Sequence, residues 1–326
     1  MKIDLTPPPW ATHLVSDLDD WLRAPRPVAD VAPFEVPDDA YFEYAWLDRD
    51  GTPRPDPDNP NPPRNEWWPY ARYLAGPAYV PDPWAEVPAK TAPAGVVRRL
   101  RLDSRHLQEQ RHVLVYTPAG QAGRPLPQVV FQDGKAYYGW GRTPQIFDRL
   151  LQAGRCEPAH LVFIPPVRRS VEYHLNDRYL AFVHEEVLPA VEERAPCLHG
   201  RRVAWGASMG GFCSAELAWR HPLSFQTVVS QSGAFLFHPG QRIGDDPHGG
   251  RPWWRERVGR EAWRPVRWHL QTGTLEWLHE PNRNLARALE IAGYDVRYAE
   301  RPSGHNWTTW RNGLAEGFRF ALPVGA

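Results

Sequence analysis

The residues best suited to chemistry are a serine and the glycines around it. A G-x-S-x-G pattern occupies residues 206–210 with Ser208 at its centre, between an apolar run at 203–205 and a helix-like segment at 212–219. A strand, a sharp turn and a helix are the context in which this pattern forms a nucleophile elbow, since the residues two before and two after the serine must lack a bulky Cβ. An ordinary glycine-rich turn is the alternative. The pattern predicts that Ser208 is a nucleophile whose hydroxyl projects above a sheet.

A serine hydroxyl is a weak nucleophile unless a base takes its proton, and in hydrolases with this elbow the histidine comes last in the chain. The sequence holds 13 histidines, so most of them have other roles. His305 lies between the last predicted strand and the C-terminal helix, whereas His269 is expected inside a strand and His279 at a helix start. We therefore expect His305 to be the base.

The third member of such a triad is an acid that follows a strand between the serine and the histidine. Glu276 lies in a short loop after a predicted strand, from which its carboxylate can orient the ring of His305. Glu280, Asp245 and Asp246 are the alternatives, each of which is otherwise a solvated surface charge. We expect Glu276 to be the acid.

Two backbone amides are needed to bind the oxyanion that forms when the serine attacks a carbonyl. One follows the nucleophile, and the other comes from a loop after an earlier strand. The sequence predicts the amides of Met209 and Lys135, the latter because residues 131–135 follow the first central strand and contain a glycine. The Lys135 side chain either meets an anionic substrate or points into solvent.

Alternating strands and helices must position these groups. From residue 96 onward, short apolar runs predict strands, and apolar spacing predicts helices at 176–194 and 285–292. Such runs are typical of strands buried on both faces of a parallel sheet. The predicted strands cover residues 96–102, 112–116, 129–132, 161–164, 203–205, 227–230, 268–271 and 296–298. The sequence therefore predicts a mostly parallel α/β sheet with helices on both faces over residues 96–326.

Residues 1–95 differ from the rest in composition and pattern. They hold 19 of the 36 prolines, and short β-type runs at 13–15, 34–36 and 41–46 are separated by turns. The proline-rich run at 53–60 cannot form a continuous hydrogen-bond ladder, so we expect an extended loop there. We predict a small all-β module and a stiff connector over residues 1–95.

Composition excludes several classes of protein. The 38 basic and 38 acidic residues cancel, which gives no support for nucleic-acid binding. We see neither a membrane span nor an apolar leader, and the three cysteines lack a C-x-x-C pair, so we expect a cytoplasmic protein without structural disulfides. No H-E-x-x-H cluster is present, so we expect neither a metal nor a cofactor. The sequence does not indicate the oligomeric state.

From about residue 96 to the C-terminus the chain resembles the enterochelin (enterobactin) esterase-like branch of the α/β-hydrolases. The matching segments are residues 111–118, 132–135, 138–140, 169–173, 186–189, 206–210, 273–276 and 304–311. The resemblance implies an α/β-hydrolase fold in which Ser208 is the nucleophile, His305 the base and Glu276 the acid. Asn306 departs from the family pattern, because siderophore esterases often have Asp there. Lys135 also departs, at a position that is often apolar.

The first third of the chain resembles the immunoglobulin-like modules that precede some enterochelin esterases. The matching residues are 14–21, 41–44 and 56–57. Such a module is expected either to form a lid and substrate wall or to brace the catalytic core.

Together these features predict a serine carboxylic-ester hydrolase that forms an acyl-enzyme, with a small aromatic or catecholate ester as its substrate. The residues expected near the substrate are Trp67, Trp68, Tyr137, Trp140, Arg169, Trp307 and Trp310. Aromatic faces and arginine suit rings and anions, whereas packing in the core is the alternative for the tryptophans. An acyltransferase, a sugar or feruloyl esterase and a non-catalytic binding protein on the same scaffold remain the other hypotheses.

Overall fold

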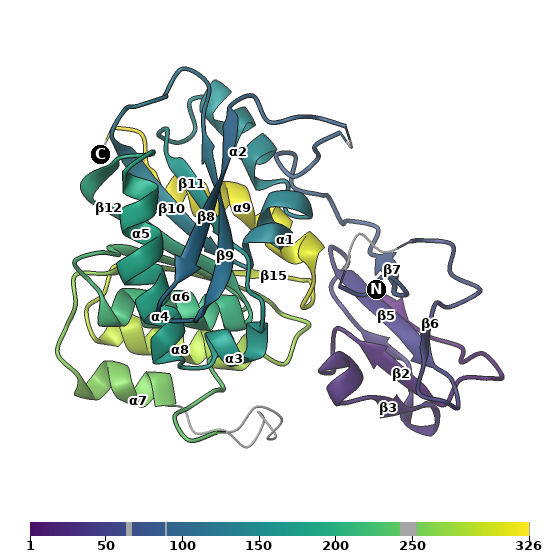
Figure 1. Cartoon of the computed structure of the whole chain (residues 1–326). Coiled ribbons are helices and arrows are strands. Elements are labelled where there is room, and N and C mark those ends of the chain that lie inside the picture. Colours follow the sequence, from purple (N-terminus) through teal and green to yellow (C-terminus); the bar gives the residue numbers. More distant parts are fainter. Residues whose placement is uncertain (63–66, 89, 242–252, 326) are drawn as a thin grey trace.

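A computed structural model describes residues 1–62, 67–88, 90–241 and 253–325 of the 326-residue chain. Its centre is an eight-stranded mixed sheet in the order β8-β9-β11-β10-β12-β13-β14-β15. The strands are β8 (Val96–Ser104), β9 (Glu109–Thr117), β10 (Leu126–Gln132), β11 (His160–Ile164), β12 (Cys197–Ala207), β13 (Thr227–Gln231), β14 (Arg267–Gly273) and β15 (Val296–Arg301). Strands β10 to β15 are parallel to one another, and β8 and β9 are antiparallel. The predicted α/β sheet is confirmed (Figure 1).

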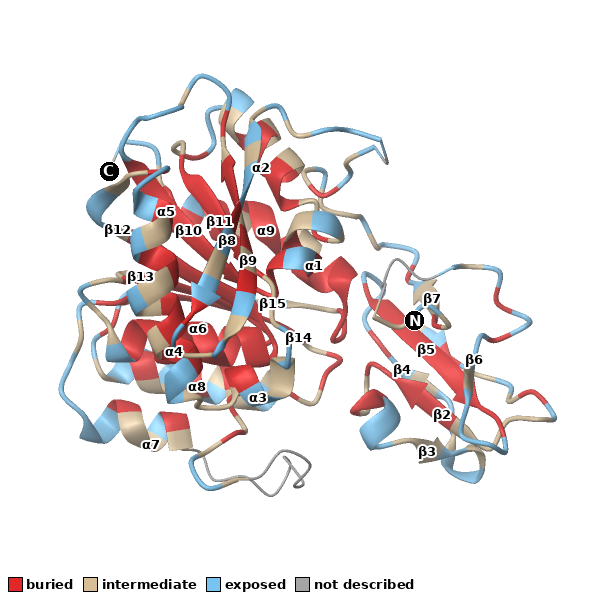
Figure 2. Ribbon diagram, in the orientation of Figure 1, coloured by how far each residue is buried: buried red, intermediate tan, exposed pale blue. Residues whose placement is uncertain are grey.

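Helices cover both faces of this sheet and enclose two separate hydrophobic cores. One face carries α1 (Gly134–Gly139), α2 (Thr143–Gln152) and α9 (Trp307–Ala321). The other carries α3 (Arg169–Tyr173), α4 (Asp177–Ala181), the π-helical η3 (Phe182–Val187), α5 (Leu188–Glu192), α6 (Met209–Arg220), α7 (Trp253–Arg260) and α8 (His279–Ile291). Side chains of the central strands alternate between the cores: Val203 and Trp205 belong to the first and Ala204 to the second. These strands are buried on both faces (Figure 2).

The N-terminal segment, residues 1–95, is built from short strands around the long, buried β5 (Tyr41–Leu47). Its other elements are β1 (Lys2–Ile3), β2 (His13–Ser16), η1 (Trp21–Arg23), β3 (Arg26–Pro27), η2 (Val28–Asp30), β4 (Phe34–Glu35), β6 (Pro53–Arg54) and β7 (Arg72–Ala75). One sheet has the order β3-β2-β5-β6, with β7 also paired to β5, and β1 pairs with β4. The segment is therefore β-rich, while its immunoglobulin-like character stays a prediction.

The expectation of loop throughout residues 53–60 is wrong at its first two residues. Pro53 and Arg54 form β6 and pair with Leu47 and Trp46 of β5. A proline fits there because β6 is an edge strand, where a missing backbone donor breaks no inner ladder. Among the described residues, no helix has the length and apolar character needed to cross a membrane.

Candidate active site

The backbone of Ser208 has a conformation that is unusual for a residue with a side chain. Ser208 follows β12 and precedes α6, with φ 57° and ψ −124°. Its amide donates to the Gln231 carbonyl (2.8 Å), and its own carbonyl accepts from the amides of Phe212 (3.1 Å) and Ala234 (3.0 Å). Because a positive φ costs free energy outside glycine, these bonds hold a strained turn of the kind found at functional sites.

Close contacts explain why glycine occupies positions 206 and 210 of the pattern. A Cβ on Gly206 would lie 2.2 Å from the Gly210 carbonyl oxygen, and a Cβ on Gly210 would lie 2.8 Å from Asp133 Oδ2. Neither approach leaves room for a methyl group. Strand β12 can therefore turn directly into α6 and expose Ser208 only with glycine at position 206, where the obstacle is backbone.

A buried histidine–carboxylate pair lies beyond the ends of β14 and β15. His305 Nδ1 hydrogen bonds to Glu276 Oε2, while Glu276 Oε1 accepts from Thr272 Oγ1 (2.6 Å) and the Gly273 amide (2.8 Å). An ionised carboxylate only accepts hydrogen bonds, so Nδ1 carries the proton and Nε2 is the basic nitrogen. This is the tautomer that a general base for a serine requires.

Charge and hydrogen bonding keep Glu276 ionised. Burial alone raises the pKa of this carboxyl, but the charge of His305 and the hydrogen bonds from His305, Thr272 and Ser232 outweigh it, so the pKa lies below its usual value. Two indole rings hold the imidazole in place: the Trp277 and Trp310 rings lie 4.5 and 5.0 Å from it.

Ser208 and His305 line the same cavity, which has a volume of about 400 Å³. Its wall contains residues from the N-terminal segment and from the loops of the sheet. The lining residues are Asp20, Leu22, Arg23, Trp67, Trp68, Arg169, Ser170, Ser208, Met209, Ala234, Leu236, Phe237, Trp277, Leu278 and His305. Cavities of this size, mostly apolar with a few polar groups, are typical of small-molecule sites. A carbonyl compound bound in this cavity can reach both Ser208 and His305.

A family model described as "Putative esterase" matches residues 104–321, about two thirds of the sequence. The chain belongs to this family. The match spans the central sheet from the end of β8 to α9 and includes the elbow, Glu276 and His305.

Curated relatives agree with the family assignment. The iron(III) enterobactin esterase of Dickeya dadantii is 27% identical over 267 residues, covering 73% of this chain and 58% of the relative. The iron(III) salmochelin esterase of Escherichia coli O6:H1 is 24% identical over 219 residues, covering 64% of this chain and 54% of the relative. The aligned part therefore spans little more than half the length of either relative.

The fold also agrees with that of a solved relative. The ferric enterobactin esterase from Salmonella typhimurium superimposes with a TM-score of 0.76 at 19% identity, covering 95% of this chain and 88% of that chain. The likeness extends over the N-terminal segment as well as the family's central sheet, since so much of the chain is covered.

Three of the seven residues expected near the substrate line the cavity: Trp67, Trp68 and Arg169. The other four lie behind its wall, around α1 and α9: Tyr137, Trp140, Trp307 and Trp310. They contribute to a core instead, which agrees with the packing alternative for tryptophan. The sequence did not indicate Leu22, Phe237 or Leu278, whereas the position of Trp277 beside Glu276 was a signal that could have been used.

Arg169 is paired within the protein and is not a free anion site. Its guanidinium donates twice to Asp133, at 2.7 Å each, and once to the Ala207 carbonyl at 3.1 Å. It also lies over the Trp67 ring, 5.1 Å from the centroid. Arg169 therefore joins Asp133, which precedes α1, to Ala207, which precedes Ser208.

The two proposed oxyanion donors both lie in the first turn of a helix. Met209 begins α6 and lines the cavity, and Lys135 is the second residue of α1. First-turn amides have no acceptor within their own helix, so they can bind an anion. The Lys135 side chain is exposed and is not among the lining residues, which fits the solvent alternative.

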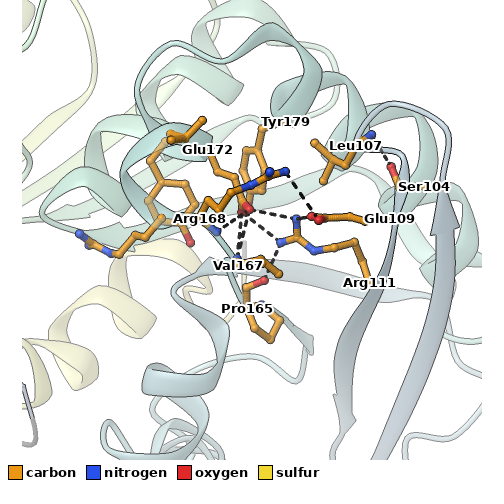
Figure 3. Close-up of polar contacts among 12 residues, drawn as sticks. Ser104, Leu107, Glu109, Arg111, Pro165, Val167, Arg168, Glu172 and Tyr179 are labelled. Carbon is orange, nitrogen blue, oxygen red and sulfur yellow. Dashed lines mark hydrogen bonds and ion pairs between the residues drawn. The ribbon is translucent and has the colours of Figure 1, made fainter. Parts of the chain in front are cut away.

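A buried ion pair between Arg111 and Glu172 stabilises the loop between β11 and α3 (Figure 3). Glu172 accepts from Arg111 Nη1 and Nη2, at 3.2 and 3.0 Å, and from the Val167 and Arg168 amides, at 3.1 and 2.8 Å. Arg111 also donates to the Pro165 carbonyl at 2.8 Å. Because both charges are buried, losing one partner is costly, so the pair stabilises the loop after β11.

Of the alternative acids, only Glu280 is among the described residues, and it does not pair with His305. Glu280 is exposed and pairs with Arg283 at 3.0 Å. Asp245 and Asp246 lie outside the described residues. Within the described part of the chain, no group of three or more His, Cys, Asp or Glu side chains could hold a metal ion.

Proposed function

We propose that the chain is a serine carboxylic-ester hydrolase with Ser208, His305 and Glu276 as its triad. The observation that carries the proposal is a strained serine and a carboxylate-paired histidine on one cavity. His305 Nε2 takes the proton of Ser208 Oγ as the oxygen attacks the ester carbonyl, and the amides of Met209 and Lys135 stabilise the oxyanion. The imidazolium then protonates the departing alcohol. Water, deprotonated by the same nitrogen, releases the acid from the acyl-enzyme.

We further propose an aromatic acyl group as the substrate class, of the catecholate kind that the resemblance to enterochelin esterases implies. Trp67, Trp68, Phe237 and Trp277 supply aromatic faces around the cavity, on which a ring can stack. Membership of the esterase family supports an ester as the substrate. Acyl transfer to a sugar or another alcohol would use the same acyl-enzyme, with the acceptor replacing water.

The test compares S208A with S214A in hydrolysis of activated short-chain esters and of catecholate-siderophore, feruloyl, acyl-sugar and S-formyl thioester substrates. Ser214 is the matched control because it is buried in α6 but does not line the cavity. We expect S208A to lose at least about 10³-fold in kcat, with S214A close to wild type. S208A should also lose covalent labelling by a fluorophosphonate.

Unchanged turnover in S208A would contradict the proposed mechanism. Absence of both turnover and labelling in the wild-type protein would favour a non-catalytic binding protein. An acyl-transfer product that dominates in mixtures of water and an alcohol acceptor would instead favour an acyltransferase.

A further inference from the structure

The loop that carries Glu276 is packed into the N-terminal segment on both sides of the acid. Leu275 is buried in a hydrophobic cluster with Phe42 and Trp46 of β5. Trp277 packs against a second cluster of the same segment, which contains Trp21. The two neighbours of the proposed acid therefore have their side chains among residues that precede them by more than 200 positions.

The loop that carries His305 is held by the same segment. The Tyr41 amide donates to the Pro302 carbonyl at 2.9 Å, and Tyr41 and Ser303 form a parallel bridge. A Cβ on Gly304 would lie 2.1 Å from Asp17 Cγ, so the Asp17 side chain lies directly on the backbone beside His305. In Figure 1 the N-terminal segment lies next to the end of β15 from which this loop starts.

One buried side-chain bond fixes this contact. Asn306 Nδ2 donates to Asp17 Oδ2 at 3.0 Å, and both residues are fully buried. The Asn306 oxygen sets the orientation of its side-chain amide. Oδ1 accepts from the Thr309 backbone amide at 2.9 Å and caps α9, so Nδ2 faces Asp17. Asp17 Oδ2 also accepts from the Glu43 amide at 2.7 Å, which ties the bond to β5.

We propose that the N-terminal segment is a positioning element of the active site, holding the acid loop and the base loop together, with Asp17–Asn306 as its polar contact to the base loop. The inference rests on the proposed function, because it assigns His305 and Glu276 their catalytic roles. Asp17 and Asn306 do not line the cavity, so they are positioning residues that act through His305.

The groups around Asp17 make this contact sensitive to an added charge. Glu43, Tyr41 and Glu276 interact electrostatically with Asp17. Burial, and then the charge of Glu43, raise the pKa of Asp17 well above its usual range. A second carboxylate facing Asp17 can therefore be accommodated only if a proton lies between the two oxygens.

The test is Asn306→Asp, which keeps a good helix cap and changes only the group that faces Asp17. At low pH a shared proton preserves the contact. As pH rises, two like charges repel and the base loop shifts. We expect kcat of N306D relative to wild type to fall with rising pH, to about 10²-fold below wild type at pH 9, with KM little changed. The ratio to wild type removes any pH dependence that the two proteins share.

Partner and control variants separate positioning from stability. The double variant D17N/N306D has no like-charge pair. Its kcat relative to wild type should therefore recover and no longer depend on pH, and this recovery does not require a change in melting temperature. Asp48→Asn is the control. It replaces a carboxylate that accepts hydrogen bonds from the Asp50 and Thr52 amides in the β5–β6 turn, away from both loops. D48N should keep the wild-type kcat.

A second pair of variants probes the acid loop. Leu275→Ala and Val36→Ala both truncate the cluster around Phe42, but only Leu275 adjoins Glu276. We expect L275A to lower kcat more than V36A does at equal loss of melting temperature. Equal kcat losses would mean that the segment stabilises the fold without positioning the acid.

An NMR measurement tests the inference even if the protein hydrolyses no ester. At each pH the Nδ1 proton resonance of His305 in N306D should differ from that of wild type in position or width, and the difference should grow as the pH rises. Wild-type kcat and a resonance that matches wild type at every pH from 6 to 9 in N306D would overturn the inference. Failure of the proposed function is distinct, since wild-type protein would then lack Ser208-dependent turnover.

Discussion

At the scale of single residues, the charge of Glu276 is the property that the site depends on most. Its two oxygens accept from His305, Thr272 and the Gly273 amide, and in the proposed mechanism the carboxylate orients the imidazole and stabilises the imidazolium. Glu276→Gln keeps the size but puts an amide donor where acceptors are needed. We expect kcat for ester hydrolysis to fall about 10²–10⁴-fold, measured by steady-state kinetics. A loss confined to KM would contradict the assignment.

The same variant has a predictable effect on acid stability. The pKa of Glu276 is lowered from its usual value of 4.5, so the folded protein favours the ionised form. That contribution to the free energy of unfolding is complete above pH 4.5 and is lost as the pH falls through the lowered pKa. E276Q has no such proton, so the stability difference between wild type and E276Q should shrink on acidification. Urea unfolding at several pH values measures it, and a difference that grows would contradict the prediction.

At the scale of elements, the elbow between β12 and α6 depends on the absence of one side chain. A methyl on Gly206 would lie 2.2 Å from the Gly210 carbonyl oxygen. The backbone could relieve this overlap only by a shift that also moves Ser208. We expect Gly206→Ala to lower the free energy of unfolding by about 3 kcal/mol and to reduce activity in the fraction that folds. Gly259→Ala is the matched control, since a Cβ there meets nothing within 4 Å in an exposed position of α7, and it should gain about 0.5–1 kcal/mol. Equal melting temperatures for the two variants would show that the elbow tolerates a side chain.

The elements differ in how far the sequence predicted them. Every predicted strand from residue 96 onward corresponds to a strand of the sheet, because apolar runs bounded by turns reflect burial on both faces. The two-residue β6 leaves no comparable periodic signal, and the helix predicted over 176–194 gave no sign of its π-helical turn at Phe182–Val187. The roles of Ser208, Glu276 and His305 came from chain order and stay predictions. The Asp17–Asn306 bond joins residues 289 positions apart, and a contact between segments so distant has no pattern in one sequence.

At the scale of the whole molecule, side chains from either side of residue 95 pack into hydrophobic clusters of the other side, and the division into two domains stays a prediction. Leu275 lies within a cluster of the N-terminal segment, and Trp67 of that segment packs in the core around α9. Two domains with independent cores would unfold in two steps, whereas segments that exchange side chains unfold together. We therefore expect one calorimetric transition for the 326-residue chain, with an enthalpy of about 230 kcal/mol near 60 °C that equals its van't Hoff value. A fluorophosphonate bound at Ser208 should raise that single midpoint, because residues of both segments line the cavity it occupies. Two resolved transitions, with only the second shifted by the inhibitor, would show instead that the N-terminal segment folds and acts apart from the site.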